Sequence, residues 1–435
     1  MILSNKFIIF LRQILLKKIY IILKLIIIFV MDIIAIIPCI IIRLISPIYT
    51  IRIARMAASN FGDFVWMPAM YYCKKKLKID QPKKKYIDLV YIHYSDKIYN
   101  KQIAKMWKKK FNFLPFYLLD PIARVNKLIP GWQKHTIKNL VIQERDINNL
   151  FEKYQALDFT TEEETHGKET LKKFGLKNGD KFVCLAVRDK SFQLEKISSG
   201  KRNWNYHDFR HTNIDKFFLA AEELTKRGYY VFRMGVTVEK EFSSPNKMII
   251  DYANSELRSD FMDVYLGAKC SFCISTGYGF QDLPGVFKKP LIEISTPLGN
   301  ACTHNKKYMI MTKHHINKKN GKALSLSEIF SSGAAFTYTT EGFNEKDIEL
   351  IENTPDEIKD LTIEMVDKLE GKQKLNEEDQ KMQNIFKDLY SQNIRKVDYH
   401  STIKNEYDNH KKPFHGEVRS IYSNSFIRKN RGWLK

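Results

Sequence analysis

A turn that contains two glycines follows a short apolar segment and has the composition of an anion-binding loop. The turn reads Ser275, Thr276, Gly277, Tyr278 and Gly279, and residues 271–275 are typical of a buried strand. We expect a helix directly after the turn, so that its unpaired backbone N–H groups face the carboxyl edge of a sheet. The pattern predicts a phosphate site, although a glycine turn that only reverses the chain has the same residues.

Charged side chains stand where three further strands are expected to end. Residues 181–187 read as a buried strand that runs into Arg188, and strands 229–234 and 248–251 carry a charged residue near their carboxyl ends. An arginine can hold a diphosphate through two parallel charged hydrogen bonds. The residues that could bind such a diphosphate-bearing ligand, called the donor-binding residues below, are Arg188, Asp189, Arg202, Arg210, Arg233, Asp251, Ser275, Thr276, Gly277, Tyr278 and Gly279.

The elements that position these residues alternate regularly along the chain. Residues 248–294 read as strand, helix, strand, glycine turn, helix and strand, and the last of these is the apolar strand 291–294 after Lys288-Lys289-Pro290. Strands that alternate with helices are typical of a parallel, doubly wound sheet. The predicted fold class is therefore α/β.

The order of these segments resembles a group of bacterial glycosyltransferases that act in surface-polysaccharide biosynthesis. The resemblance covers roughly residues 50–435 and includes VRD at 187–189, WNYHDFR at 204–210 and FMDVYL at 261–266. The chain is more distantly similar to fucosyltransferases, but Ala186 replaces the histidine of their HVR motif, so a fucose donor does not carry over. The resemblance implies a GT-B architecture, with two facing Rossmann-like domains and the sugar nucleotide in the C-terminal one.

Two residues of the N-terminal half are candidate general bases. Residues 51–68 read as a strand, a Gly-Asp turn and a helix, and they resemble the opening of heptosyltransferases. In those enzymes an acidic residue after the first strand accepts the proton of the acceptor hydroxyl, which makes Asp63 the first candidate. The alternative is an aspartate that only caps the helix. His93, at the end of the expected strand 88–93, is the second candidate.

The first fifty residues are strongly apolar. Residues 7–23 are interrupted by basic residues, and residues 25–42 form an apolar run that contains Asp32 and Pro38. A membrane span needs about 20 apolar residues, and an aspartate at the bilayer centre costs about 3 kcal/mol. Two arrangements therefore stay open: a basic hairpin in the cytoplasmic leaflet, or a single span. Either one predicts a membrane-associated protein on the cytoplasmic side of the bacterial inner membrane.

The composition limits the classes of partner that the protein is expected to bind. The 435 residues carry a formal net charge of +22, which suits an anionic membrane surface or phosphate-bearing substrates. The lysines are spread along the chain without a nucleic-acid motif, so we expect no nucleic-acid partner. The six cysteines form neither a disulfide nor a zinc framework, and neither HExxH nor Asp-x-Asp occurs. We therefore expect no metal and no cofactor.

The sequence thus predicts four segments and one main function. We expect a membrane-associated hydrophobic segment at 1–48, a Rossmann-like acceptor domain at 49–165, a sugar-nucleotide domain at 166–395, and a tail at 396–435 that packs back on the N-terminal domain. The predicted function is transfer of a hexosyl- or deoxyhexosyl-type sugar from a nucleoside-diphosphate sugar to a surface-polysaccharide or lipid-linked glycan. The alternative is a non-catalytic, membrane-attached protein that binds sugar nucleotides or glycans.

Overall fold

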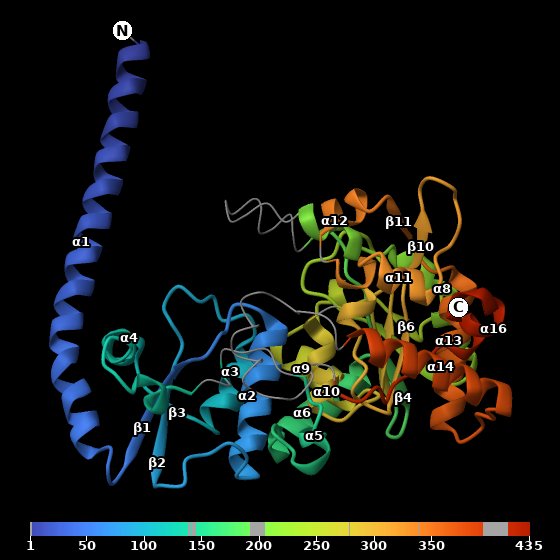
Figure 1. Ribbon diagram of the computed structural model, residues 1–435, viewed down its shortest axis with the longest axis horizontal. Coiled ribbons are helices and arrows are strands. Elements are labelled where there is room, and N and C mark those ends of the chain that lie inside the picture. Colours follow the sequence, from blue (N-terminus) through green and yellow to red (C-terminus); the bar gives the residue numbers. More distant parts are fainter. Residues whose placement is uncertain are drawn as a thin grey trace. The chain divides into compact units, whose positions relative to one another are not determined.

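The computed structural model describes residues 2–137, 140, 145–191, 205–277, 279–337, 339–394 and 416–435. The chain forms two compact units. The first contains Met1–Ser59, Lys78–Tyr99 and Ala104–Ile142, and the second contains Asn60–Leu77, Asn100–Ile103 and Gln143–Lys435. Both units combine parallel strands with helices (Figure 1), which confirms the predicted α/β class. Two predicted donor-binding residues, Arg202 and Tyr278, lie outside the described residues.

The first unit is built on a three-stranded parallel sheet. Its strands are β1 (Thr50–Arg55), β2 (Tyr86–Tyr91) and β3 (Asn112–Phe113), in the order β1-β2-β3. Helix α4 (Phe116–Asn126) packs on this sheet and buries Leu119 against Ile53 and Tyr91. Helix α3 (Lys101–Lys108) precedes β3.

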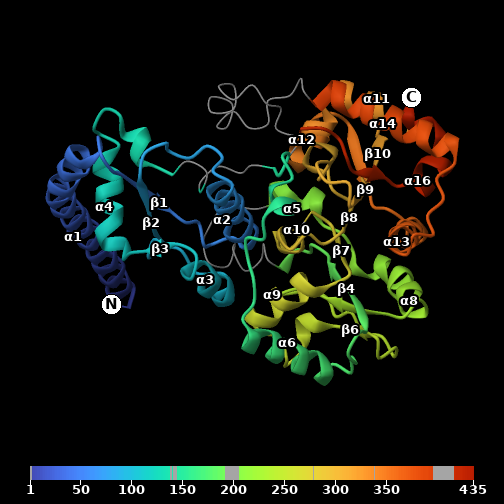
Figure 2. The same ribbon diagram turned by 90° about the horizontal axis from the view of Figure 1, so that it is seen from below.

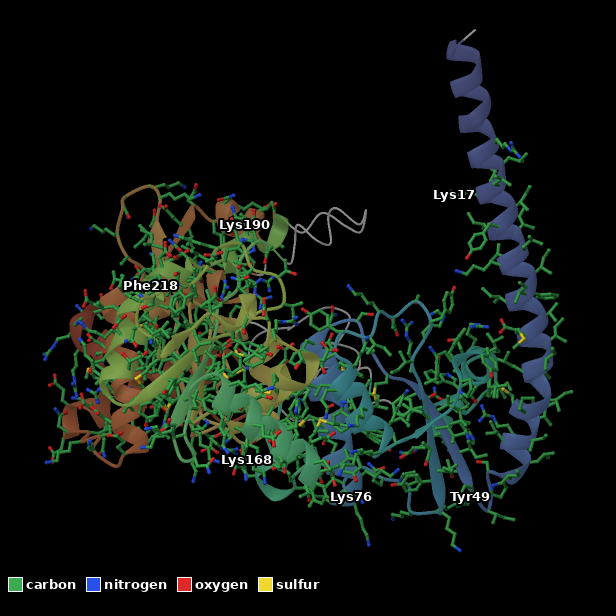
Figure 3. All side chains as sticks on the ribbon, turned by 180° about the vertical axis from the view of Figure 1, so that it is seen from behind. Lys17, Tyr49, Lys76, Lys168, Lys190 and Phe218 are labelled. Atoms are coloured by element: carbon green, nitrogen blue, oxygen red, sulfur yellow. The ribbon has the colours of Figure 1, made fainter. Side chains whose placement is uncertain are left out.

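Helix α1 (Ile2–Ile45) is one continuous helix of 44 residues, so the predicted hairpin is wrong. Its segment Leu15–Ile45 is long and apolar enough to cross a membrane, by length and composition only. The C-terminal part of the helix packs on α4 through Ala35 and Cys39. Asp32 accepts a charged hydrogen bond of 2.7 Å from Arg124 of α4. The N-terminal part, which includes Lys17, runs on beyond α4 (Figures 1 and 3).

The second unit is built on a seven-stranded sheet in which every pair of neighbouring strands is parallel. Its order is β12-β9-β8-β7-β4-β5-β6, with the central strands buried on both faces, as in doubly wound folds. The strands are β4 (Lys181–Ala186), β5 (Tyr229–Arg233), β6 (Ile249–Ile250), β7 (Phe272–Ser275), β8 (Leu291–Ile294), β9 (Tyr308–Met311) and β12 (Ile421–Tyr422). The parallel sheet predicted from the alternating pattern is therefore confirmed.

Helices surround this sheet (Figure 2). They include α6 (Thr161–Lys173), α8 (Phe218–Lys226), α9 (Asp260–Lys269), α10 (Asp282–Val286), α13 (Pro355–Leu369), α14 (Glu377–Ile394) and α16 (Asn424–Lys429). Two of them begin with a capping box, in which a threonine hydroxyl and a glutamate side chain satisfy each other's backbone N–H groups. The first box is formed by Thr160 and Glu163, and the second by Thr354 and Glu357.

Several segments that were predicted to lie in the N-terminal domain or to pack on it belong to the second unit, among them Asn60–Leu77, Asn100–Ile103 and the part of 49–165 from Gln143 on. Helix α2 (Phe61–Lys76), predicted as part of the N-terminal domain, packs on α10 and on the turn η6 (Gly279–Gln281). Residues 416–435, predicted to return to the N-terminal domain, add β12 to the seven-stranded sheet beside β9. Their apolar side chains, including Phe426 and Trp433, enter the core of the second unit. Burial of these aromatic rings explains why this segment stays with the large sheet.

Candidate active site

The carboxyl ends of β4 and β7 are joined by hydrogen bonds that involve two predicted donor-binding residues. The backbone N–H of Arg188 donates to Thr276 Oγ1 at 2.9 Å, and the N–H of Thr276 donates to Ala186 O at 3.2 Å. Thr276 is buried, while Arg188 is partly exposed at the same sheet edge. The structure therefore brings Arg188 and the glycine turn together.

Arg210 reaches the same turn from the 3-10 helix η3 (Asn205–Arg210). Its Nη2 donates to the carbonyl oxygen of Gly277. Gly277 has a φ of 70°, and a Cβ at this position would lie 2.7 Å from Thr296 Oγ1 after β8. The glycine is therefore required by both the left-handed backbone and the neighbouring hydroxyl. Arg188 through its backbone N–H and Arg210 through its guanidinium thus both contact a turn at the carboxyl edge of the sheet.

Two further side chains at this edge, His211 and Lys313, were missed as site residues from the sequence. His211 follows Arg210 directly, and Lys313 follows β9. The Nζ of Lys313 donates to the backbone oxygen of His211 at 2.5 Å, and the N–H of Thr212 donates to Arg188 O at 3.1 Å. The position of Lys313, two residues beyond an apolar strand, is the signal that could have identified it.

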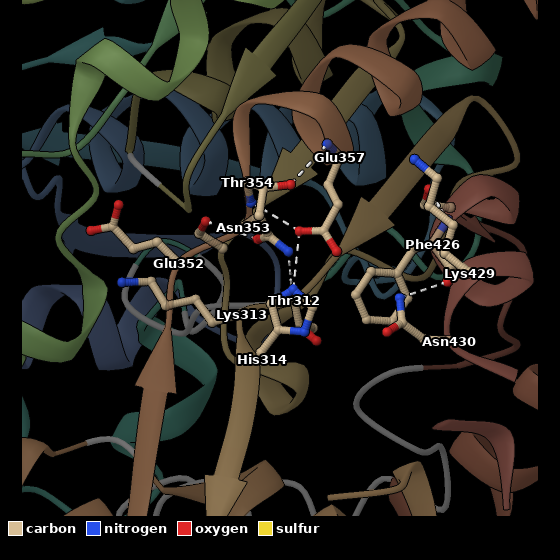
Figure 4. Close-up of polar contacts among 12 residues, drawn as sticks. Thr312, Lys313, His314, Glu352, Asn353, Thr354, Glu357, Phe426, Lys429 and Asn430 are labelled. Atoms are coloured by element: carbon tan, nitrogen blue, oxygen red, sulfur yellow. Dashed lines mark hydrogen bonds and ion pairs between the residues drawn. The ribbon is translucent and has the colours of Figure 1, made fainter. Parts of the chain in front are cut away.

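Lys313 is 6% exposed and lies beside Glu352 (Figure 4). Burial lowers the pKa of Lys313 to about 8, and the Glu352 carboxylate opposes this shift. Glu352 also accepts from the backbone N–H of Asn213 at 3.3 Å. These contacts fix the chain segment that follows η3.

Arg233, Asp251 and Asp189 bond mainly to one another and to nearby backbone. The guanidinium of Arg233 is 1% exposed and lies 3.2 Å from Asp251 Oδ1 and 3.7 Å from Asp189 Oδ2. It also donates to the backbone oxygen of Lys240 at 3.0 Å, and Asp189 accepts from Glu239 N–H at 2.9 Å. This network holds residues 239–242 against the ends of β4 and β5, so these three residues support the sheet edge.

The helix predicted after the glycine turn is short. The chain passes through η6 into α10, which has five residues and contains Pro284. A five-residue helix has few aligned peptide dipoles. Its first residue, Asp282, is itself acidic, so the start of this helix is a poor site for a second anion. The helix expected after the turn is therefore present, but it is short and is preceded by the 3-10 turn η6. Ser275 ends β7 and is fully buried.

Asp63 lies in the first turn of α2, close to an acidic cluster of the second unit formed by Asp282 and Glu293. Burial, together with the carboxylates of Asp63 and Glu293, raises the pKa of Asp282 to about 8, while Arg145 opposes the rise. Glu293 is 1% exposed and accepts from Gln281 Nε2 at 3.1 Å and from Cys302 N–H at 2.6 Å. At neutral pH, Asp282 therefore holds a proton beside Asp63.

The second candidate base, His93, belongs to the first unit. Its Nδ1 lies 2.6 Å from Ser95 Oγ, and its Nε2 lies 4.0 Å from Asp120 Oδ2. Burial and the nearby cation Arg55 are the main causes that lower the pKa of His93. A neutral imidazole is the form that can accept a proton. Since Asp63 belongs to the second unit, the two candidates are not part of one unit.

Comparisons with known proteins find no matching family profile and no matching curated protein. Among solved structures, a family 9 glycosyl transferase from Veillonella parvula DSM 2008 is 10% identical, with 60% of this chain and 85% of that chain covered, at a TM-score of 0.35. The ADP-heptose LPS heptosyltransferase II of E. coli is 12% identical. The match covers 60% of this chain and 90% of that chain at a TM-score of 0.33. The E. coli heptosyltransferase WaaC with ADP-2-deoxy-2-fluoro heptose is 12% identical. The match covers 60% of this chain and 93% of that chain at a TM-score of 0.30. All three structures are glycosyltransferases. Because these TM-scores are low, the function of this chain is inferred from its own residues.

Proposed function

We propose that this protein is a glycosyltransferase of GT-B type whose second unit binds a nucleoside-diphosphate sugar. One observation carries the proposal: Arg188 and Arg210 flank the turn at Thr276 and Gly277, at the carboxyl edge of a parallel sheet. Ligands of open α/β sheets bind at this edge, and a pair of arginines matches the charge and shape of a diphosphate. The ion pairs of Arg233 with Asp189 and Asp251 stabilise the same edge of the sheet.

The reaction is substitution at the anomeric carbon of the donor sugar. The bond to the diphosphate breaks and negative charge develops on the leaving oxygen, where Arg188 and Arg210 stabilise it. Asp63 accepts the proton of the acceptor hydroxyl if the configuration inverts. His93 is the alternative base. Asp282 would keep its own proton, so that it adds no further negative charge beside Asp63.

The acceptor is a surface-polysaccharide or lipid-linked glycan at the cytoplasmic face of an anionic membrane. The segment Leu15–Ile45 of α1 supports this location because its length and composition suit a bilayer. The net charge of +22 favours the same surface. The competing function, a non-catalytic sugar-nucleotide or glycan-binding protein, has the same fold and anchor.

A donor panel with the detergent-solubilised protein tests this proposal. UDP-, GDP-, dTDP-, CMP- and ADP-sugars, ADP-heptose included, are incubated with the protein, and release of nucleotide is measured. We expect release with one donor class. Binding without release across the whole panel would favour the competing, non-catalytic function.

Variants of Arg188 test the observation that carries the proposal. Arg188→Lys keeps the charge but loses the planar fork, and Arg188→Ala loses both, so donor affinity should fall in that order. Lys181→Ala, at the opposite end of the same strand, is the matched control and should leave the affinity unchanged. Unchanged affinity in a folded Arg188→Ala protein would remove the main support for a sugar-nucleotide enzyme.

A further inference from the structure

His211 occupies an unusual position in the proposed donor site. Its side chain is 11% exposed, and within the described part of the chain neither ring nitrogen has a hydrogen-bond partner. Buried polar atoms normally have partners, so an imidazole in this state is prepared for a ligand. The backbone on either side is fixed, since Lys313 binds the carbonyl of His211 and Thr212 binds the carbonyl of Arg188.

The charges around His211 are mostly positive. Burial, with Arg188, Lys190 and Lys313 nearby, lowers the pKa of His211 to about 4, and Asp189 acts in the opposite direction. Asp208 Oδ1 lies 3.7 Å from Nδ1. The imidazole is therefore neutral at pH 7 without a ligand. A dianionic or trianionic ligand at Arg188 would reverse the local field and favour the imidazolium form.

We propose that His211 binds the donor diphosphate directly and takes up one proton from the solvent as the anion binds. The proton would occupy the ring so that one N–H donates to a phosphate oxygen and the other faces Asp208. No covalent bond of the donor changes in this step. The inference rests on the proposed function, because it assumes that the diphosphate lies at Arg188 and Arg210.

Proton uptake makes donor affinity depend on pH in a defined direction. Binding becomes tighter as the pH falls from above the pKa of the bound imidazole toward about 4, the value of the free protein. The steepest possible change is about tenfold in Kd per pH unit, which corresponds to about one proton for each ligand bound. Release of the nucleoside diphosphate would return the proton to the solvent.

Calorimetric titration of the full-length protein with inorganic pyrophosphate at pH 6.5 tests this inference. Titrations in PIPES and in bis-Tris, which differ in ionisation enthalpy, give the number of protons taken up. His211→Gln retains hydrogen-bonding groups but cannot be protonated, so the difference between wild type and variant removes the protonation of pyrophosphate itself. His166→Gln, at an exposed histidine of α6, is the matched control.

We expect the wild type and His166→Gln to take up more protons than His211→Gln, which should also bind about tenfold more weakly. Equal proton uptake in His211→Gln, with affinity that still depends on Arg188, would overturn this inference and leave the proposed function intact. Failure of the wild type to bind pyrophosphate, ADP or UDP, or binding unaffected by Arg188→Ala, would overturn both.

Discussion

Gly62, in the first turn of α2, and Gly279, in the turn η6, lie in close backbone contact. A Cβ on Gly62 would be 3.2 Å from Gly279 Cα, and a Cβ on Gly279 would be 3.2 Å from Gly62 N. The rings of Phe61 and Phe280 stack beside them at 6.1 Å. This contact brings Asp63 next to Asp282, so it builds the proposed catalytic base into the second unit.

Replacing Gly62 by alanine should disturb this contact. The new methyl group would meet Asp282 Oδ2 first and then the backbone of Gly279, whose Cα would lie 3.2 Å away. Overpacking of this kind costs about 1–3 kcal/mol, and activity should fall because Asp63 moves with the helix. Thermal unfolding and turnover measure the two effects. Gly432→Ala, where no heavy atom lies within 4 Å of the new Cβ, is the control. Equal behaviour of the two variants would contradict the prediction.

The raised pKa of Asp282 predicts how stability depends on pH. The folded protein keeps the proton up to a pH of about 8, whereas the unfolded chain loses it near 4. The folded state therefore binds more protons between these values, and the free energy of unfolding should decrease as the pH rises from 4 to 8. Asp282→Asn mimics the protonated acid and should flatten this dependence. Urea unfolding at several pH values would show it, and an unchanged slope in the variant would refute the assignment.

Replacing Asp63 by asparagine distinguishes a general base from a structural residue. If Asp63 accepts the acceptor proton, Asp63→Asn should lower kcat by about 10² or more while donor affinity stays nearly unchanged. The N-cap residue of α2 is Asn60, not Asp63. Retained kcat with a lower melting temperature would assign Asp63 a structural role. The parallel variant His93→Gln tests the other candidate in the same assay.

Two deletions of α1 should differ in stability. Removal of residues 2–30 keeps the part of α1 that packs on α4, including Ala35 and Asp32, whereas removal of residues 2–45 exposes that face of α4. Both deletions should release the protein from membranes in a sedimentation assay. Only the longer deletion should lower the melting temperature, because it removes buried apolar contacts. If the protein that lacks residues 2–45 still pellets completely with membranes, α1 is not the anchor.

The periodic segments of the sequence predicted the large sheet well. Buried strands such as 181–186 and 272–275 consist mostly of apolar residues, and a polar residue, Arg188 or Thr276, stands within two positions of the carboxyl end of each. The sequence alone therefore predicts that Arg188 and Thr276 lie at the same sheet edge, and the hydrogen bond between them agrees with this prediction. Local patterns of this kind act over a few residues, and in this sheet the tertiary contacts agree with them.

Long-range contacts explain what the sequence did not reveal. The assignment of α2 to the second unit depends on two glycines that are 217 positions apart, Gly62 and Gly279. Lys313 is surrounded by lysines and histidines in the sequence, and only its burial beside Glu352 distinguishes it. The capping boxes at the starts of α6 and α13, by contrast, are local contacts between residues three positions apart.

The position of α2 also determines how the protein can be divided. Its buried side chains, including Phe64, Met70 and Tyr71, pack within a unit whose sheet begins more than a hundred residues later. A fragment that starts at Gln143 would lack this helix and expose the apolar surface that it covers, a condition that promotes aggregation. A chimera that exchanges the large sheet must therefore also exchange residues 60–77. The part of the chain that has to be exchanged is not one contiguous stretch of sequence.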